Sequence, residues 1–332
     1  MTFFLRKLLL FASPFLILII LFFGSYLYWD PFRVVYGYDD FSNLNVLPSR
    51  DYISTETFIR NRKKYNYDSF IFGTSRTLAF RPEEWKKYLN EKTSPFMFDA
   101  SNENLYGIYI KLKYLDSINV NVKNVLLIFC RNASFREKDM DGHLYVRHPE
   151  TSNISWIEFH KSFLNAYGNL DFLYSFYSFK LTGKYHDWMK SYIQQSKVSV
   201  DFVTNRVTLV DREKAIINNP DKYYSDNNIF YDRGKEQMDS IQRINGKQIF
   251  YLAEIKRILE KHKSNYKIVL SPLYEQIKFS KADIKVLNEI FPNKVYDFSG
   301  VNSFTNSITN YYESSHFRIN VGDSIMARIY TQ

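Results

Sequence analysis

The sequence predicts an α/β protein in which helices cover both faces of a parallel sheet, preceded by one transmembrane helix. Two observations predict the sheet. Short apolar segments alternate with amphipathic segments over residues 66–135, and the same alternation returns over residues 246–332. A third observation predicts the membrane helix, because residues 8–29 form an apolar run without a charged side chain.

The composition is that of a folded chain, long enough for one large domain or two modest domains. Of the 332 residues, 18% are aromatic and only 11 are glycine, so the chain is neither disordered nor fibrous. The single cysteine, Cys130, excludes an internal disulfide and lies in the apolar run NVLLIFC, where a small buried side chain is expected. The net charge of +9 is compatible with an anionic partner, but acidic and basic residues are interspersed, and nucleic acid is not expected as a partner.

The amino-terminal apolar run predicts a transmembrane anchor over residues 1–30. At 1.5 Å per residue, the charge-free part spans roughly 30 Å of hydrocarbon. Arg6 and Lys7 precede it, so the positive-inside rule places the rest of the chain outside the cytoplasmic membrane. Its far end carries an aromatic belt made of Tyr26, Tyr28 and Trp29. A cleaved signal peptide is the alternative, but the run is longer than a signal core and no A-x-A-like site follows it.

Residues 31–62 are polar with scattered aromatic side chains, and we expect them to form a stalk. A domain over residues 63–332 follows. Its first part predicts strands at 68–73, 95–100 and 124–130 and helices at 82–91 and 105–118. Pro82 in the first turn, with acidic residues beside it, indicates where the first of these helices begins.

Residues 136–245 lose the alternation and are predicted to be an insertion. They contain helical fragments such as WIEFHKSFLNAYG and polar loops such as NNPDKYYSDNN. The alternation then resumes with helices at 246–262, 280–291 and 321–330 and strands at 266–271 and 294–299. Parallel sheets of this kind bind ligands at the carboxyl ends of their strands, and the insertion is expected there as a lid or acceptor-binding module.

One of these carboxyl ends delivers a serine. The first predicted strand stops at Gly73, and Ser75 follows in the segment FIFGTSRT. A serine after a strand commonly caps the next helix, which is the structural interpretation of Ser75. The functional interpretation is a nucleophile, which needs a base within hydrogen-bonding distance and a group that orients this base.

Among the six histidines, His316 is best placed to be that base. It follows the last predicted strand and precedes the last predicted helix, and Glu313 lies three residues before it. One loop can therefore present a carboxylate and an imidazole together, and the carboxylate can fix the tautomer of the imidazole. His143 and His148 lie near two aspartates, but their spacing fits no standard set of metal ligands, so no metal is expected.

The segments FIFGTSRT and YYESSHFRINVG resemble the first and last sequence blocks of the SGNH (GDSL-like) hydrolase superfamily. The closer likeness is to its membrane-anchored bacterial members, which act on cell-envelope glycans. The resemblance implies a three-layer α/β/α sandwich, Ser75 as nucleophile and His316 as general base, and it implies no cofactor. Glu313 stands where the family has aspartate, and its extra methylene changes the reach of the carboxylate.

The same resemblance implies an oxyanion hole made of the N–H of the serine, a backbone N–H after the second strand and an asparagine side chain after the third. Ser101, in FDASNEN, occupies the place of the family's glycine, and Asn132, in FCRNASF, is the side-chain donor. The alternative is that residue 101 caps a helix and residue 132 a turn. Arg76 departs from the family's Gly-Asp-Ser-Leu order, and it is a candidate either for binding an anionic substrate or for a structural ion pair.

The expected activity is acyl transfer at Ser75, either to water, as in a serine esterase, or to a sugar hydroxyl, as in an O-acyltransferase. The expected substrate is an acylated cell-envelope glycan or a related ester. The alternative is a catalytically inactive SGNH-like protein that binds glycan or scaffolds an envelope complex, and the glutamate at 313 and the missing glycine keep this alternative open.

Overall fold

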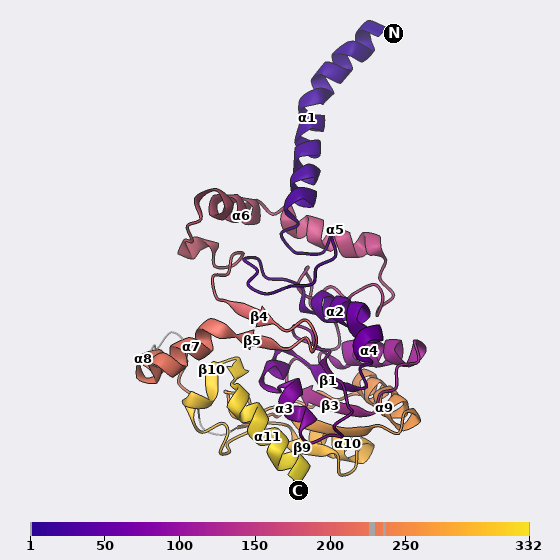
Figure 1. Cartoon of the computed structure of the whole chain (residues 1–332), viewed down its shortest axis with the longest axis vertical. Helices are drawn as coiled ribbons and strands as arrows, with labels where there is room; N and C mark the ends of the chain where they lie inside the picture. Colours follow the sequence, from indigo (N-terminus) through magenta and orange to yellow (C-terminus); the bar gives the residue numbers. More distant parts are fainter. Residues whose placement is uncertain (1, 226–229, 235–236, 332) are drawn as a thin grey trace.

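A five-stranded parallel sheet forms the centre of the molecule (Figure 1). The computed structural model describes residues 2–225, 230–234 and 237–331. The strands lie in the order β2 (Pro95–Met97), β1 (Ser69–Gly73), β3 (Asn124–Phe129), β7 (Asn265–Leu270) and β9 (Val295–Asp297). The predicted α/β class and parallel sheet are confirmed. The strand order reverses between β1 and β3, and doubly wound sheets bind ligands at such a switch point.

Helices cover the sheet on both faces because successive strand residues point to opposite sides. One face buries Phe70 and Phe72 of β1 against α2, α4, α9 and α10. The other face buries Ile71 against α3 and α11. These helices are α2 (Arg50–Tyr65), α3 (Pro82–Lys86), α4 (Leu105–Ser117), α9 (Gly246–Lys261), α10 (Lys281–Ile290) and α11 (Ile319–Thr331).

Each helix and strand predicted in the two alternating regions is present, with boundaries that differ by a few residues. The largest difference is the helix predicted over 82–91, whose α-helical part ends at Lys86. The strand predicted over 95–100 pairs with β1 only as far as Met97. The short 3₁₀ helices are η1 (Ser75–Ala79), η2 (Asp187–Met189) and η3 (Ile308–Asn310). Outside the main sheet, β6 (Gln237–Met238) pairs with β8 (Ile277–Lys278), and β10 (Tyr311–Glu313) pairs with β11 (His316–Phe317).

The prediction of a stalk over residues 31–62 is wrong, because this segment packs into the folded body. Phe58 of α2 is fully buried beside the sheet, and Phe32 is buried together with helices of the insertion. The segment looks polar because α2 turns polar groups inward, where they find buried partners. Asp51, for example, pairs with Lys111 at 3.1 Å, and both side chains are almost completely buried.

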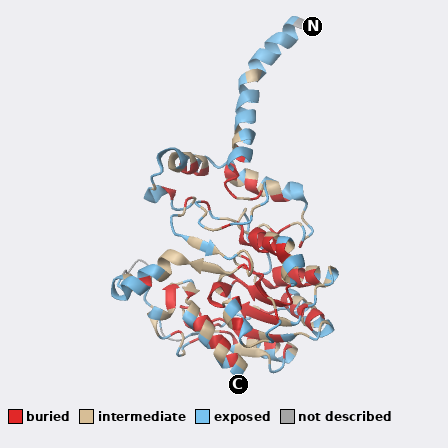
Figure 2. Cartoon of the chain, in the orientation of Figure 1, coloured by how far each residue is buried: buried red, intermediate tan, exposed pale blue. Residues whose placement is uncertain are grey.

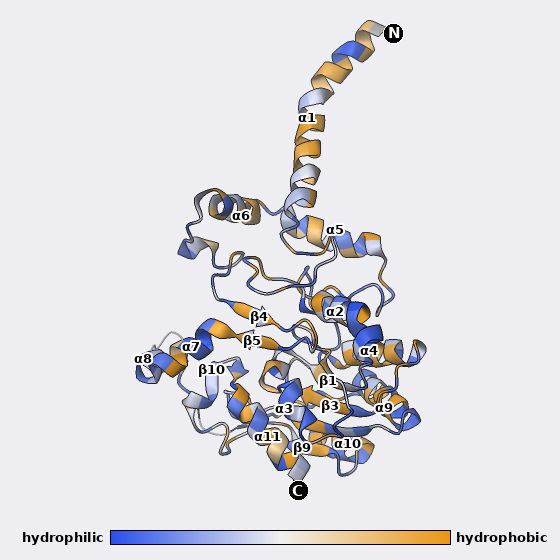
Figure 3. Ribbon diagram, in the orientation of Figure 1, coloured by the Kyte–Doolittle hydropathy of each residue, from blue (hydrophilic) through white to orange (hydrophobic). Residues whose placement is uncertain are grey.

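The first helix, α1 (Thr2–Trp29), projects from the body, and its span Phe3–Trp29 is long and apolar enough to cross a membrane. Figure 3 shows it as mostly hydrophobic, and Figure 2 shows it as mostly exposed. Its last turns pack on the body. Tyr26 is buried against Tyr167 with ring centroids 5.2 Å apart, so this residue of the predicted aromatic belt contacts protein instead.

The insertion, residues 136–245, lies between the base of α1 and the sheet (Figure 1). Two of its helices pack near α1, and a short antiparallel hairpin and two further helices lie beside the sheet. The helices near α1 are α5 (Trp156–Tyr167) and α6 (Leu170–Thr182). The hairpin consists of β4 (Val198–Val200) and β5 (Val207–Leu209), and the two further helices are α7 (Val210–Asn218) and α8 (Pro220–Tyr224). The polar loop predicted over 218–228 contains α8, and its residues 226–229 lie outside the described part of the chain.

Candidate functional site

The turn after β1 requires glycine at its first position. Gly73 has φ of +151°, and a Cβ atom there would lie 2.5 Å from the carbonyl oxygen of Ile128 on β3. The chain then enters η1, and Thr74 caps it by accepting a hydrogen bond from the N–H of Arg76 at 3.3 Å. Since Thr74 is the capping residue, the Ser75 side chain is available for another partner. The capping interpretation of Ser75 is therefore wrong.

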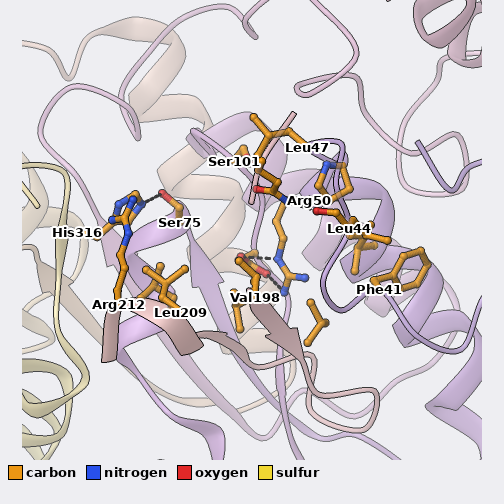
Figure 4. Close-up of a pocket in the computed structure, with 17 residues that line it drawn as sticks. Phe41, Leu44, Leu47, Arg50, Ser75, Ser101, Val198, Leu209, Arg212 and His316 are labelled. Atoms are coloured by element: carbon orange, nitrogen blue, oxygen red, sulfur yellow. Dashed lines mark hydrogen bonds and ion pairs between the residues drawn. The ribbon is translucent and has the colours of Figure 1, made fainter. Parts of the chain in front are cut away.

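That partner is His316. The short hairpin β10–β11 places Glu313 opposite His316, and Ser75 Oγ lies 2.8 Å from His316 Nε2 (Figure 4). Glu313 Oε1 accepts a hydrogen bond from His316 Nδ1. A carboxylate only accepts, so Nδ1 carries the proton and Nε2 is free to accept one from the serine. The structure thus joins the predicted serine, histidine and carboxylate in one hydrogen-bonded chain across 241 residues.

Helix α11 follows this hairpin and fixes it against η1. A Cβ atom at Gly322 would lie 2.0 Å from the carbonyl oxygen of Ala79, so the helix reaches η1 only because residue 322 is glycine. Phe80 and Phe317 also pack edge to face with centroids 6.0 Å apart. The serine and the histidine are therefore held by two elements in direct contact.

The surroundings of Glu313 keep its carboxyl ionised. Burial alone would raise the pKa of Glu313, but the hydrogen bond and charge of His316, the N–H of Ser315 and the charge of Arg212 outweigh burial and lower this pKa to about 2. A carboxylate that stays charged across the ordinary pH range can orient the imidazole and stabilise the imidazolium that forms during proton transfer.

Arg212 is a residue of this site that the sequence did not indicate. It lies on α7 of the insertion, and its Nη1 donates to Glu313 Oε1 at 2.9 Å. The same part of the insertion holds the hairpin at other points. Glu213 pairs with Arg318 at 3.0 Å, and Tyr223 donates to the carbonyl oxygen of Tyr312 at 2.6 Å. The local sequence VDREKAIIN does not indicate that Arg212 contacts a carboxylate 101 residues further along the chain.

A pocket of about 240 Å³ opens beside the serine and the histidine (Figure 4). Polar lining residues are Arg50, Ser75, Asp99, Ser101, Gln194, Arg212 and His316. Apolar lining residues come from the segment between α1 and α2, from α2 itself, from η1 and from the insertion: Phe41, Leu44, Leu47, Pro48, Ile53, Leu78, Val198, Val200, Val207 and Leu209. Residues of the insertion therefore line the pocket together with residues that follow the carboxyl ends of β1 and β2.

The remaining predicted site residues differ in their placement. Ser101 lines the pocket in the turn after β2, and its N–H makes no hydrogen bond to a described residue. Asn132 is exposed, lies outside the pocket lining and has no side-chain hydrogen bond within the described chain. Arg76 is half-buried and also lies outside the lining, and its Nε is buried without a partner among the described residues.

The two histidines considered for a metal lie apart from this pocket. His148 is fully buried and contacts Glu56 Oε1 at 3.1 Å, whereas His143 packs on Phe32 with centroids 4.7 Å apart. Burial lowers the pKa of His143 to about 4. Within residues 2–225, 230–234 and 237–331, no group of three potential ligand side chains could hold a metal ion.

No model of a protein family matches the chain, and no curated protein matches it significantly.

Proposed function

We propose that the protein is a membrane-anchored serine esterase or O-acyltransferase of SGNH type. The observation that carries this proposal is the continuous hydrogen-bonded chain from Ser75 through His316 to Glu313. A nucleophile, a base within 2.8 Å and an acid on the other ring nitrogen are the three parts that acyl transfer requires. The pocket beside them is where an ester would lie.

In the proposed reaction, Ser75 Oγ attacks the ester carbonyl carbon while His316 Nε2 takes the serine proton. Two backbone N–H groups stabilise the negative oxygen. That of Ser75 has no intrahelical partner at the start of η1, and that of Ser101 makes no hydrogen bond within the described chain. The tetrahedral intermediate collapses, and His316 returns its proton to the departing alcohol. The acyl-enzyme then passes its acyl group to water or to a hydroxyl acceptor, activated by the same imidazole.

The proposed substrate is an ester on a cell-envelope glycan or a related molecule outside the cytoplasmic membrane. The apolar α1 and the basic residues that precede its central part support an anchor with the folded body outside. Fractionation should leave the full-length protein in the membrane, with the body accessible to protease only from the outer side. A soluble form that begins near residue 25 would contradict the anchor.

Ester turnover by the full-length protein in detergent tests the activity. We expect Ser75→Ala to lower turnover of a chromogenic ester by at least about 10³-fold. Ser101→Ala is the matched control in the same pocket, because it keeps the N–H to which we assign the oxyanion role, and it should retain activity within about threefold. Equal turnover by wild type and Ser75→Ala would refute the proposal and favour the inactive, glycan-binding alternative.

A further inference from the structure

The apolar part of the pocket belongs to a two-stranded hairpin outside the main sheet. In β4–β5, Val198 pairs with Leu209 and Val200 pairs with Val207, whereas Ser199 pairs with Thr208. Side chains of directly paired residues lie on the same face of a hairpin. The four apolar side chains therefore share one face, and all four line the pocket.

The segment between α1 and α2 extends this apolar surface. The N–H of Asn43 donates to the carbonyl oxygen of Val198 at 2.8 Å, and the N–H of Val200 donates to Ser42 Oγ at 2.9 Å. These bonds fix Phe41 and Leu44 beside the hairpin. Figure 4 shows Ser75 and His316 at one end of the pocket and Leu44 and Phe41 at the other.

The charged groups along the pocket are paired within the protein, although Arg50 Nη1 is buried without a hydrogen-bond partner among the described residues. Arg50 forms two hydrogen bonds with Asp99, at 2.8 and 3.0 Å, and a third with the carbonyl oxygen of Asn205. Gln194 donates to the carbonyl oxygen of Leu44 at 2.7 Å. No unpaired carboxylate among the described lining residues requires a cation, and Arg212 is paired with Glu313. Because these charges are paired and most of the lining side chains are apolar, the interior of the pocket favours an uncharged, apolar occupant.

Resting on the proposed function, we infer that this pocket holds the acyl chain of the ester and selects a linear aliphatic chain of medium length. A water molecule takes up roughly 30 Å³ of liquid, and a methylene group has a similar size, so the pocket of about 240 Å³ admits a chain of up to about eight carbons. An acetyl group leaves the far apolar surface in contact with water. A palmitoyl chain exceeds the available volume.

The measurement is kcat/KM for p-nitrophenyl acetate, butyrate, hexanoate, octanoate and palmitate with the full-length protein in detergent. Each buried methylene should raise kcat/KM about fourfold until the pocket is full. We therefore expect a maximum between butyrate and octanoate, at least about tenfold above acetate, and a fall at palmitate.

Leu44→Trp fills the far end of the pocket, so it should lower kcat/KM for octanoate at least about tenfold and for acetate less than about twofold. Leu181→Trp is the control, because Leu181 is 83% exposed on α6 and lies outside the pocket lining. Highest activity with acetate or palmitate, or an equal loss for all esters in Leu44→Trp, would overturn this inference while leaving the proposed function intact. No turnover of any ester, together with no modification of Ser75 by a serine-reactive probe, would overturn the proposed function and this inference with it.

Discussion

Replacement of Gly73 by alanine tests whether the close contact of β1 with β3 positions the nucleophile. The new Cβ would lie 2.5 Å from the carbonyl oxygen of Ile128, whereas Cβ contacts below 3.0 Å essentially do not occur, so the two backbones must separate by about 0.5 Å or more. Strain at positive φ costs about 1–3 kcal/mol, and overpacking costs about 1–3 kcal/mol more. We therefore expect Gly73→Ala to lower the free energy of unfolding by about 2–6 kcal/mol.

The control is Gly142→Ala. Gly142 also has a positive φ, +103°, but a Cβ there would meet no atom within 4 Å. It should therefore show only the strain, about 1–3 kcal/mol. The assays are urea unfolding and ester turnover on the same preparations, and displacement of Ser75 should lower turnover about 10²-fold in Gly73→Ala alone. Equal stability and equal turnover of the two variants would show that the contact between Gly73 and Ile128 does not position Ser75.

Three further results are expected. Arg212→Met should lower turnover about fivefold or less, because the ion pair of Arg212 with Glu313 is partly exposed. The same substitution should have no further effect in a Glu313→Gln background. A loss of the same size in that background, or in the control Lys214→Met on the same helix, would show that Arg212 does not act through Glu313. Asn132→Ala should change turnover less than about threefold and stability by less than about 0.5 kcal/mol, whereas a loss of 10²–10³-fold would assign it to the oxyanion hole. The pKa of Glu313 is lowered from 4.5 to about 2 on folding, so its ionised form stabilises the fold above pH 4.5, and this contribution is lost as the pH falls toward 2. Urea midpoints of wild type and Glu313→Gln should therefore converge over that range, and a gap that is independent of pH would contradict the assigned ionisation.

Much of the fold follows from the sequence, because the buried strands are continuous apolar runs and the helices between them are amphipathic. NVLLIF is buried over five of its six residues, as a central parallel strand must be. The helix α2 was missed because it buries charged residues. Lys111 neutralises Asp51 and Glu103 at 3.1 and 2.8 Å, and a hydropathy pattern does not reveal such compensation.

The candidate site was predictable where a short motif contained the information. Gly73 and Ser75 are two residues apart, and Glu313 and His316 are three apart, so each half of the site is local in the sequence. The pocket wall was not predictable. VSV and VTL are three-residue strands whose pairing, and therefore whose common apolar face, depends on a hairpin that no pattern of that length can indicate.

The most direct test of the proposed activity is covalent labelling of the full-length protein by a fluorophosphonate probe, with the modified residue located by mass spectrometry. We expect modification at Ser75, lost in Ser75→Ala and slowed by about 10²–10⁴-fold in His316→Gln, because an alcohol becomes a nucleophile only when its base accepts the proton. An unmodified Ser75, or a labelling rate unchanged by His316→Gln, would contradict the claim that this histidine activates this serine.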